Sequence, residues 1–237
     1  MKESWEYLIK PIKSLSLLKK LKFLKYIIFI IFLAFLLSIG IAYFIYLLLE
    51  GLIWSFFDLS QIHSMIKFLV YAVIVLQSFF LFLVFYRVFV QIFVFPFLLL
   101  LRKELEKHYR IGNFQKTNFF LSFRNFLWSL YKTLLFQVVY LFLLVFTFFL
   151  GPLQPLILFL YQGYSLGYGI YDILLEQEFP TPKERYQLIE SIKKEVFFTG
   201  VGALILIFIP ILGVILSPVS GFIAAFQNRY QRYLILV

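Results

Sequence analysis

Two long apolar stretches dominate the first half of the chain. Residues 26–49 carry no charged side chain, and residues 68–86 are interrupted only by Gln77 and Ser78. At about 1.5 Å per helical residue, each stretch can cross a hydrocarbon core of about 30 Å. The pattern predicts two transmembrane helices, 26–49 and 68–86, and the second continues as a cytoplasmic extension to residue 101.

The second half is apolar as well, but its apolar stretches are broken by Pro and Gly. Residues 134–150 end at the sequence GPLQP and are followed by a second apolar arm, which predicts a helical hairpin over 134–175. A second hairpin is predicted over 196–228, with arms 196–209 and 218–228. These last two arms are about 21 and 17 Å long as helix, too short to cross. We therefore expect two Pro/Gly-broken hairpins, of which the second is re-entrant, and for each of them both partial insertion and full crossing stay open.

Composition supports a membrane protein. Hydrophobic residues make up 62% of the chain, 33 of its 237 residues are Phe and only 14% are charged, so the chain could not stay soluble as a globule. We expect a single all-α integral membrane domain over 1–237. The absence of Cys excludes a disulfide framework, Cys-ligated zinc and iron–sulfur clusters.

Positive charge lies next to the apolar stretches. Lys residues crowd the segment 1–25, and Lys and Arg recur in the predicted loop 102–132. The positive-inside rule places both segments in the cytoplasm, and the tight turns of the hairpins return loop 176–195 and the C-terminus to the same side. The net charge of +10 therefore sets topology, and we expect membrane lipid as a partner and no nucleic acid.

The breaks in the hairpins are candidate anion sites. Ser217 followed by Pro218 has the form of a helix N-cap and first helical residue, and Gly151 followed by Pro152 can begin the other return arm. Pro210 and Gly213 complete the second break. A helix N-terminus inside a membrane offers free N–H groups and the positive end of a dipole. The alternative is that these prolines only make tight turns.

Small residues recur every four positions beside the breaks. They are Gly163 and Gly167 in the first hairpin and Ser217, Gly221 and Ala225 in the second. Such faces let two helix backbones approach closely, so we expect them to be packing surfaces. A smooth wall beside a permeation path is the alternative.

The sequence contains no set of residues that predicts an enzyme. Residues 163–167 match G-x-S-x-G, but a hydrolase of that type needs a His after its Ser, and none follows Ser165. The two His residues, His63 and His108, fall on opposite sides of the membrane in the predicted topology. We expect no catalytic residues, no metal site and no cofactor.

Three segments carry a family resemblance. Residues 95–106 read FPFLLLLRKELE, residues 167–180 read GYGIYDILLEQEFP, and residues 200–225 read GVGALILIFIPILGVILSPVSGFIAA. In order and spacing they resemble the CysZ/etoposide-induced-protein family of membrane proteins. The matching positions include Pro96, Phe97, Glu106 and Asp172.

The resemblance implies a multi-pass protein of the bacterial inner membrane, forming a homo-oligomer and taking up sulfate. The family's Gly-Leu-Arg turn should fall within residues 16–25, which read SLLKKLKFLK here. Lys19, Lys20 and Lys22 could supply the charge of the missing Arg, without its bidentate geometry. Two functions follow: passive or ion-coupled uptake of a small oxyanion, sulfate first, or a membrane scaffold of the same fold that transports nothing.

Overall fold

The computed structural model describes residues 2–18, 64–109, 111, 119–208 and 212–234, together with scattered positions between 29 and 51. For some helical residues, including 80–87 and 89–97, only the backbone is described. Half of the expected first transmembrane helix, 26–49, lies outside the described residues, and the helix stays a prediction.

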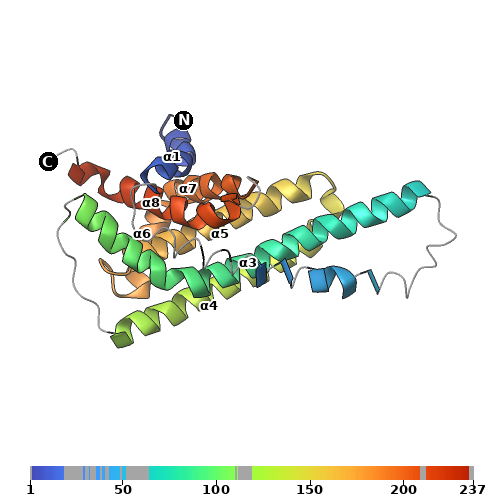
Figure 1. Ribbon diagram of the computed structural model, residues 1–237, viewed down its shortest axis with the longest axis horizontal. Coiled ribbons are helices and arrows are strands. Elements are labelled where there is room, and N and C mark those ends of the chain that lie inside the picture. Colours follow the sequence, from blue (N-terminus) through green and yellow to red (C-terminus); the bar gives the residue numbers. More distant parts are fainter. Residues whose placement is uncertain are drawn as a thin grey trace.

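Every regular element in the described part of the chain is a helix (Figure 1). The elements are α1 (Lys2–Leu18), α3 (Ser64–His108), α4 (Phe119–Phe146), η2 (Phe148–Leu150), α5 (Leu153–Leu175), α6 (Pro182–Ser191), α7 (Lys193–Ile205), η3 (Leu206–Phe208) and α8 (Leu212–Leu234). The predicted all-α fold class is confirmed to this extent.

Two antiparallel hairpins form the body of the molecule. Helices α4 and α5 make the first, α7 and α8 make the second, and α5 packs against α7 between them. The long helix α3 runs along both hairpins, while α1 lies on α7 and α8 (Figure 1). The core forms where α3, α5 and α8 meet, around the fully buried side chains of Leu101, Leu105, Tyr171, Leu174 and Phe226.

Glycine makes the contact between α5 and α7 possible. A Cβ atom added at Gly167 would lie 2.1 Å from the carbonyl oxygen of Val196, and one added at Gly200 would lie 2.0 Å from the carbonyl oxygen of Gly163. Gly221 on α8 is similarly enclosed by Ile170. Gly163, Gly167 and Gly221 are therefore packing positions, as the sequence predicts, because an added side chain would collide with the neighbouring helix.

The N-terminal segment is not only a basic tail. Its residues 2–18 form α1, which packs closely on the second hairpin. The backbone of Leu8 lies so near Gly202 that an added Cβ there would be 2.1 Å from its carbonyl oxygen. The Ser14 hydroxyl also donates a hydrogen bond to the carbonyl of Ser220, 3.0 Å away.

Two predicted loops are largely helical. The expected loop 102–132 contains the last turns of α3 and the first half of α4, and the expected loop 176–195 contains α6 and the start of α7. Both were predicted from their charge. Buried charged side chains are tolerated on these helices because they form ion pairs with other parts of the fold. The pattern of charge along the sequence does not reveal such pairs.

The turn of the first hairpin lies where the sequence predicts it. Gly151 has φ +55°, a left-handed conformation that glycine adopts without a steric penalty, and Pro152 directly precedes α5. The helix start is surrounded by exposed apolar side chains such as Phe149 and Leu153. Gly151 therefore forms the turn at the apolar tip of the first hairpin.

The second hairpin differs from the prediction. Helix α8 begins at Leu212, so Gly213 lies in its first turn and Ser217 and Pro218 lie in its interior. Ser217 is fully buried, and its hydroxyl has no hydrogen-bond partner among the described residues, so it does not cap a helix. A proline in a helix interior removes one backbone hydrogen bond, a loss that tight packing on both sides can tolerate. The predicted arm 218–228 is thus only part of a longer helix.

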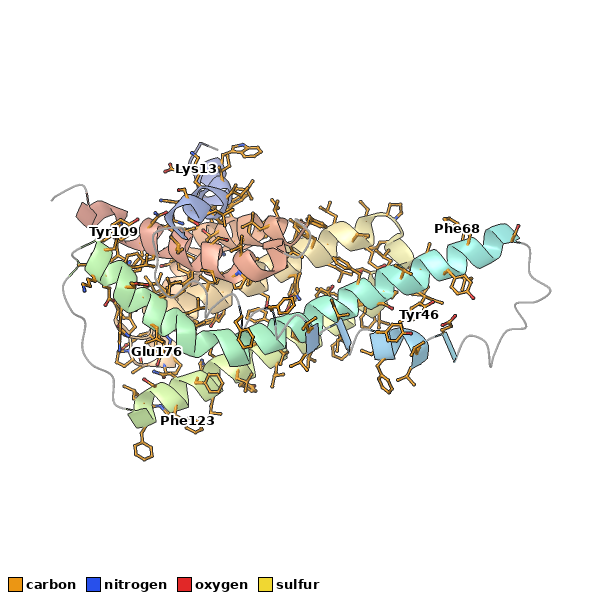
Figure 2. All side chains as sticks on the ribbon, viewed as in Figure 1. Lys13, Tyr46, Phe68, Tyr109, Phe123 and Glu176 are labelled. Atoms are coloured by element: carbon orange, nitrogen blue, oxygen red, sulfur yellow. The ribbon has the colours of Figure 1, made fainter. Side chains whose placement is uncertain are left out.

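By length and composition, one helix among the described residues can cross a membrane, over Phe120–Phe146. A shorter apolar helical stretch, Phe68–Phe79, belongs to α3. Figure 2 shows Phe68 near the end of α3 that extends past the hairpins, where its side chain is largely exposed. The second expected transmembrane helix thus lies on a continuous helix, while its crossing stays a prediction.

Candidate functional site

Helix α4 carries its polar side chains on the buried face. The residues are Asn125, Ser129, Thr133, Gln137 and Tyr140, each at most 3% exposed. Their spacing of three or four positions places them on one side of a helix. The opposite side exposes large apolar side chains, including Leu134, Val138 and Phe142. This distribution is the reverse of a helix in a water-soluble protein and suits a helix surrounded by lipid.

The polar face of α4 meets α5 in antiparallel register. The Asn125 amide donates to the Glu176 carboxylate at 3.4 Å, and the Gln162 amide donates to the Gln137 carbonyl oxygen at 3.4 Å. Near the tip, the Gln154 amide donates to the backbone carbonyl of Leu144 at 2.7 Å. We call this contact, from Asn125 to Leu144 on α4, the polar seam. It is about 28 Å long at 1.5 Å per residue, close to the thickness of a hydrocarbon core.

The middle of the polar seam contains donors without acceptors. Nε2 of Gln137 and the hydroxyl of Tyr140 are buried and have no hydrogen-bond partner among the described residues. A carboxamide nitrogen offers two N–H donors and a phenol one O–H donor. An unmade hydrogen bond in an interior costs about 1 to 3 kcal/mol, so both groups are available to donate to a water molecule or a ligand.

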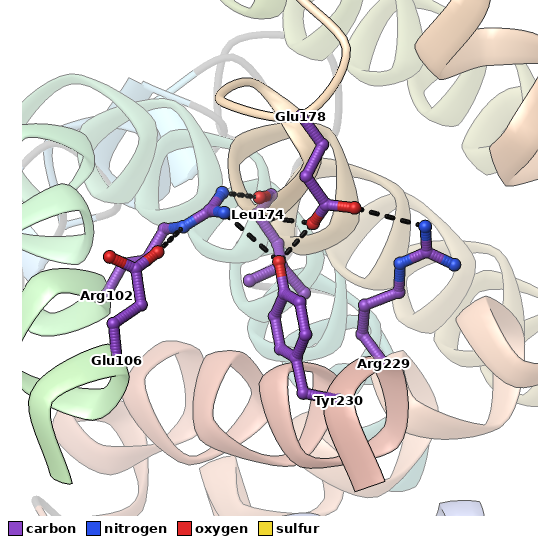
Figure 3. A network of polar contacts seen from close by, with 6 residues as sticks. All are labelled: Arg102, Glu106, Leu174, Glu178, Arg229 and Tyr230. Atoms are coloured by element: carbon purple, nitrogen blue, oxygen red, sulfur yellow. Dashed lines mark hydrogen bonds and ion pairs between the residues drawn. The ribbon is translucent and has the colours of Figure 1, made fainter. Parts of the chain in front are cut away.

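At one end of the molecule, a buried arginine ties three helices together. Nε of Arg102 lies 2.7 Å from the Glu106 carboxylate on the same helix. One terminal nitrogen donates to the carbonyl oxygen of Leu174, and the other donates to the Tyr230 hydroxyl at 3.1 Å (Figure 3). Arg102 therefore links α3 to the end of α5 and to α8.

The carboxylate of Glu178 completes this arginine cluster. It accepts a hydrogen bond from the Tyr230 hydroxyl, forms an ion pair with Arg229 at 3.1 Å and lies 3.7 Å from Arg102 (Figure 3). Burial raises the pKa of the Tyr230 hydroxyl, so it stays protonated and can donate to Glu178. The guanidinium of Arg102 already binds protein groups through each of its nitrogens. The cluster therefore holds helices together and is not an open anion site.

A second buried arginine holds the turn between α5 and α6. Nε of Arg185 lies 2.8 Å from the Asp172 carboxylate, and one terminal nitrogen donates to the carbonyl oxygen of Phe179 at 3.0 Å. Beside this pair, burial raises the pKa of Glu176 to about 7, an effect that the charge of Arg185 and the hydrogen bond from Asn125 offset only in part.

Two of the four family-motif residues that the sequence singles out have described ion-pair partners. Glu106 and Asp172 each form a buried ion pair with an arginine, one in the arginine cluster and one at the turn after α5. Pro96 and Phe97 lie on α3, and their side chains are outside the described part of the structure.

The residues of the predicted anion site fall in different parts of the chain, and the site stays a prediction. Lys19, Lys20, Lys22 and Pro210 lie outside the described residues. Gly151 lies at the tip of the first hairpin, whereas Gly213, Ser217 and Pro218 belong to α8 in the second. Ser217 and Pro218 lie within α8 and not at its start, and the anion-binding role of these residues stays a prediction.

Sequence reasoning missed the polar seam. Asn125, Ser129 and Thr133 repeat every four positions, which is the signal of one helical face. Because 102–132 was predicted as a loop on account of its charge, the repeat was divided between a loop and a hairpin arm. Within the described ranges, no group of three potential metal-ligating side chains lies together.

Comparison with known proteins gives one match. The family model described as sulfate transporter CysZ/etoposide-induced protein 2.4 matches residues 10–218, which is most of the chain. No curated protein and no solved structure matches.

Proposed function

This chain belongs to the sulfate transporter CysZ/etoposide-induced protein 2.4 family, and from that premise we propose that it carries a small oxyanion, sulfate first, across the bacterial inner membrane. The proposal includes a multi-pass homo-oligomer that works passively or coupled to an ion. The family is one of membrane transporters, in agreement with the apolar helix Phe120–Phe146.

The polar seam is the observation that carries the proposal. Polar groups inside a membrane are costly, and they commonly mark a substrate path or a contact between helices. In α4 they include Gln137 and Tyr140, whose donors have no acceptor among the described residues. Sulfate has only acceptor oxygens at neutral pH, so neutral N–H and O–H donors suit it. We place the anion path along the α4–α5 contact.

The basic segment before the first expected span contributes at the cytoplasmic face. Lys19, Lys20 and Lys22 would raise the local concentration of anions through their charge, a role that stays part of the proposal. The seam then replaces the helix start at Ser217 as the donor site within the membrane.

The test is uptake of radioactive sulfate by proteoliposomes, compared with empty vesicles, with phosphate and chloride as competitors. Tyr140→Phe removes only the buried hydroxyl, and Tyr131→Phe removes an exposed one from the same helix. A hydrogen bond to a charged ligand contributes about 1.5 to 3 kcal/mol. We expect Tyr140→Phe to lower uptake about tenfold or more, and Tyr131→Phe to leave it unchanged.

A scaffold without transport is the second candidate function. It is favoured by residues 16–25, which lack the Gly-Leu-Arg turn that the family resemblance predicts. In that case the seam only joins α4 to α5. Wild-type vesicles that take up no more sulfate, phosphate or chloride than empty ones, although the protein is folded and inserted, would establish the scaffold.

A further inference from the structure

A groove lies where α4, α5 and α6 meet, beside the polar seam, and its lining includes none of the polar side chains named in the seam. It has a volume of about 240 Å³. The side chains that matter here are Lys132 and Phe136 of α4, Tyr161 and Tyr164 of α5, and Tyr186 and Glu190 of α6. We call it the tyrosine groove.

The tyrosine groove contains two opposite charges that form no described ion pair with each other. Nζ of Lys132 lies 5.2 Å from the ring centre of Trp128 and 5.5 Å from that of Tyr186. The Glu190 carboxylate accepts a hydrogen bond from the Tyr164 hydroxyl at 3.3 Å. The ion pairs described in the structure involve neither Lys132 nor Glu190. One groove thus presents a cation and a carboxylate to the same ligand.

The groove opens beside an apolar surface. No charged residue occurs from 133 to 150, so Lys132 marks the end of the apolar part of α4. Leu135 and Val139 line the groove and are about 40% exposed. A ligand that fills the groove therefore meets charge at one end and hydrocarbon at the other, which describes a phospholipid with its head group at Lys132 and Glu190.

The charges select the kind of head group. A phosphate fits beside the ammonium of Lys132, and a primary amine fits beside Glu190, where tyrosine rings also attract a cation through their faces. An anionic head group without an amine would have its phosphate held but would leave Glu190 without a partner. We propose that the tyrosine groove binds the zwitterionic head group of an aminophospholipid, one that carries a phosphate and a primary amine.

This site does not depend on oxyanion transport, and its test is lipid retention. The full-length protein is reconstituted with equal amounts of phosphatidylethanolamine and phosphatidylglycerol, extracted in mild detergent, and the retained lipid is counted by mass spectrometry. We expect the wild type to retain phosphatidylethanolamine preferentially. Losing one charged contact should reduce that retention about tenfold in Glu190→Gln and in Lys132→Gln.

Matched variants separate the site from general charge effects. Lys183→Gln and Glu184→Gln remove exposed charges from α6 and should retain lipid as the wild type does. Glu190→Lys should reverse the preference toward phosphatidylglycerol, because the groove then holds two cations. Retention that is equal for both lipids in the wild type, or unchanged in Glu190→Gln, overturns the proposal. Free phosphoethanolamine that competes as well as the intact lipid would assign the groove to a soluble zwitterion and overturn the lipid assignment.

Discussion

Within the arginine cluster, Arg102 contacts more groups than any other charged side chain does. It is fully buried and contacts Glu106, the carbonyl oxygen of Leu174 and the Tyr230 hydroxyl. Removing one member of a buried ion pair leaves its partner charged and unpaired, which costs about 3 to 5 kcal/mol. We expect Arg102→Met to lower the free energy of unfolding by that amount.

The measurement is thermal unfolding of the purified protein in detergent. Lys103→Gln changes an exposed charge one position away on the same helix and should stay within about 0.5 kcal/mol of the wild type. An Arg102→Met protein as stable as Lys103→Gln would show that the arginine cluster does not stabilise the fold.

Glu176 should make stability depend on pH. Burial raises its pKa to about 7, above its usual value of 4.5, so the folded protein holds a proton that the unfolded chain releases. This contribution to stability is complete below pH about 4.5 and is lost as pH rises through about 7. We expect the melting temperature to fall from pH 5 to pH 8, and to fall less in Glu176→Gln, which cannot ionise.

Glu184 supplies the control for this pH dependence. It is exposed on α6, so Glu184→Gln should keep the pH profile of the wild type. If Glu176→Gln loses as much stability between pH 5 and pH 8 as the wild type does, another group is responsible for the dependence.

At the scale of whole helices, the α5–α7 contact should tolerate no side chain at Gly167. An added Cβ would lie 2.1 Å from the carbonyl oxygen of Val196, and backbone cannot move aside as a side-chain end can. Overpacking of this kind costs about 1 to 3 kcal/mol. We expect Gly167→Ala to lower the melting temperature in detergent, whereas Gly51→Ala, a helical position with no atom nearby, should not. Equal melting temperatures would mean that α5 and α7 can separate at no cost.

For the whole molecule, the two hairpins should reach different depths. The uncharged part of the first hairpin, 133–150, is about 27 Å long, while the uncharged arm 196–208 of the second is about 20 Å long. With the charged ends in the cytoplasm, the first tip should reach the outer surface and the second should stop inside the membrane.

Single cysteines test this difference, since the chain has none of its own. In intact cells, an impermeant thiol reagent added outside should label Leu150→Cys and leave Gly213→Cys unlabelled. Labelling of both variants would mean that the second hairpin also crosses, and labelling of neither would mean that the first hairpin is only partly inserted.

The sequence determined by itself whatever depends on neighbours along the chain. Apolar stretches and their breaks predicted an all-α protein with a hairpin turn at Gly151, and the glycines at 163 and 167 predicted close helix packing. Local periodicity and backbone freedom are sufficient for such features. The family also followed from sequence, because the order of its motifs survives along the chain.

The tertiary structure decided which polar groups meet. Arg102 forms a hydrogen bond with Tyr230, 128 positions away, and Gln162 forms one with Gln137 across a hairpin. No local sequence pattern predicts these pairings. The same limit explains why the helix start expected at Ser217 and Pro218 differs from the structure, in which both residues lie inside α8. A capping sequence fixes a helix start only where the chain before it leaves the helix, and here the helix already includes residues 212–217.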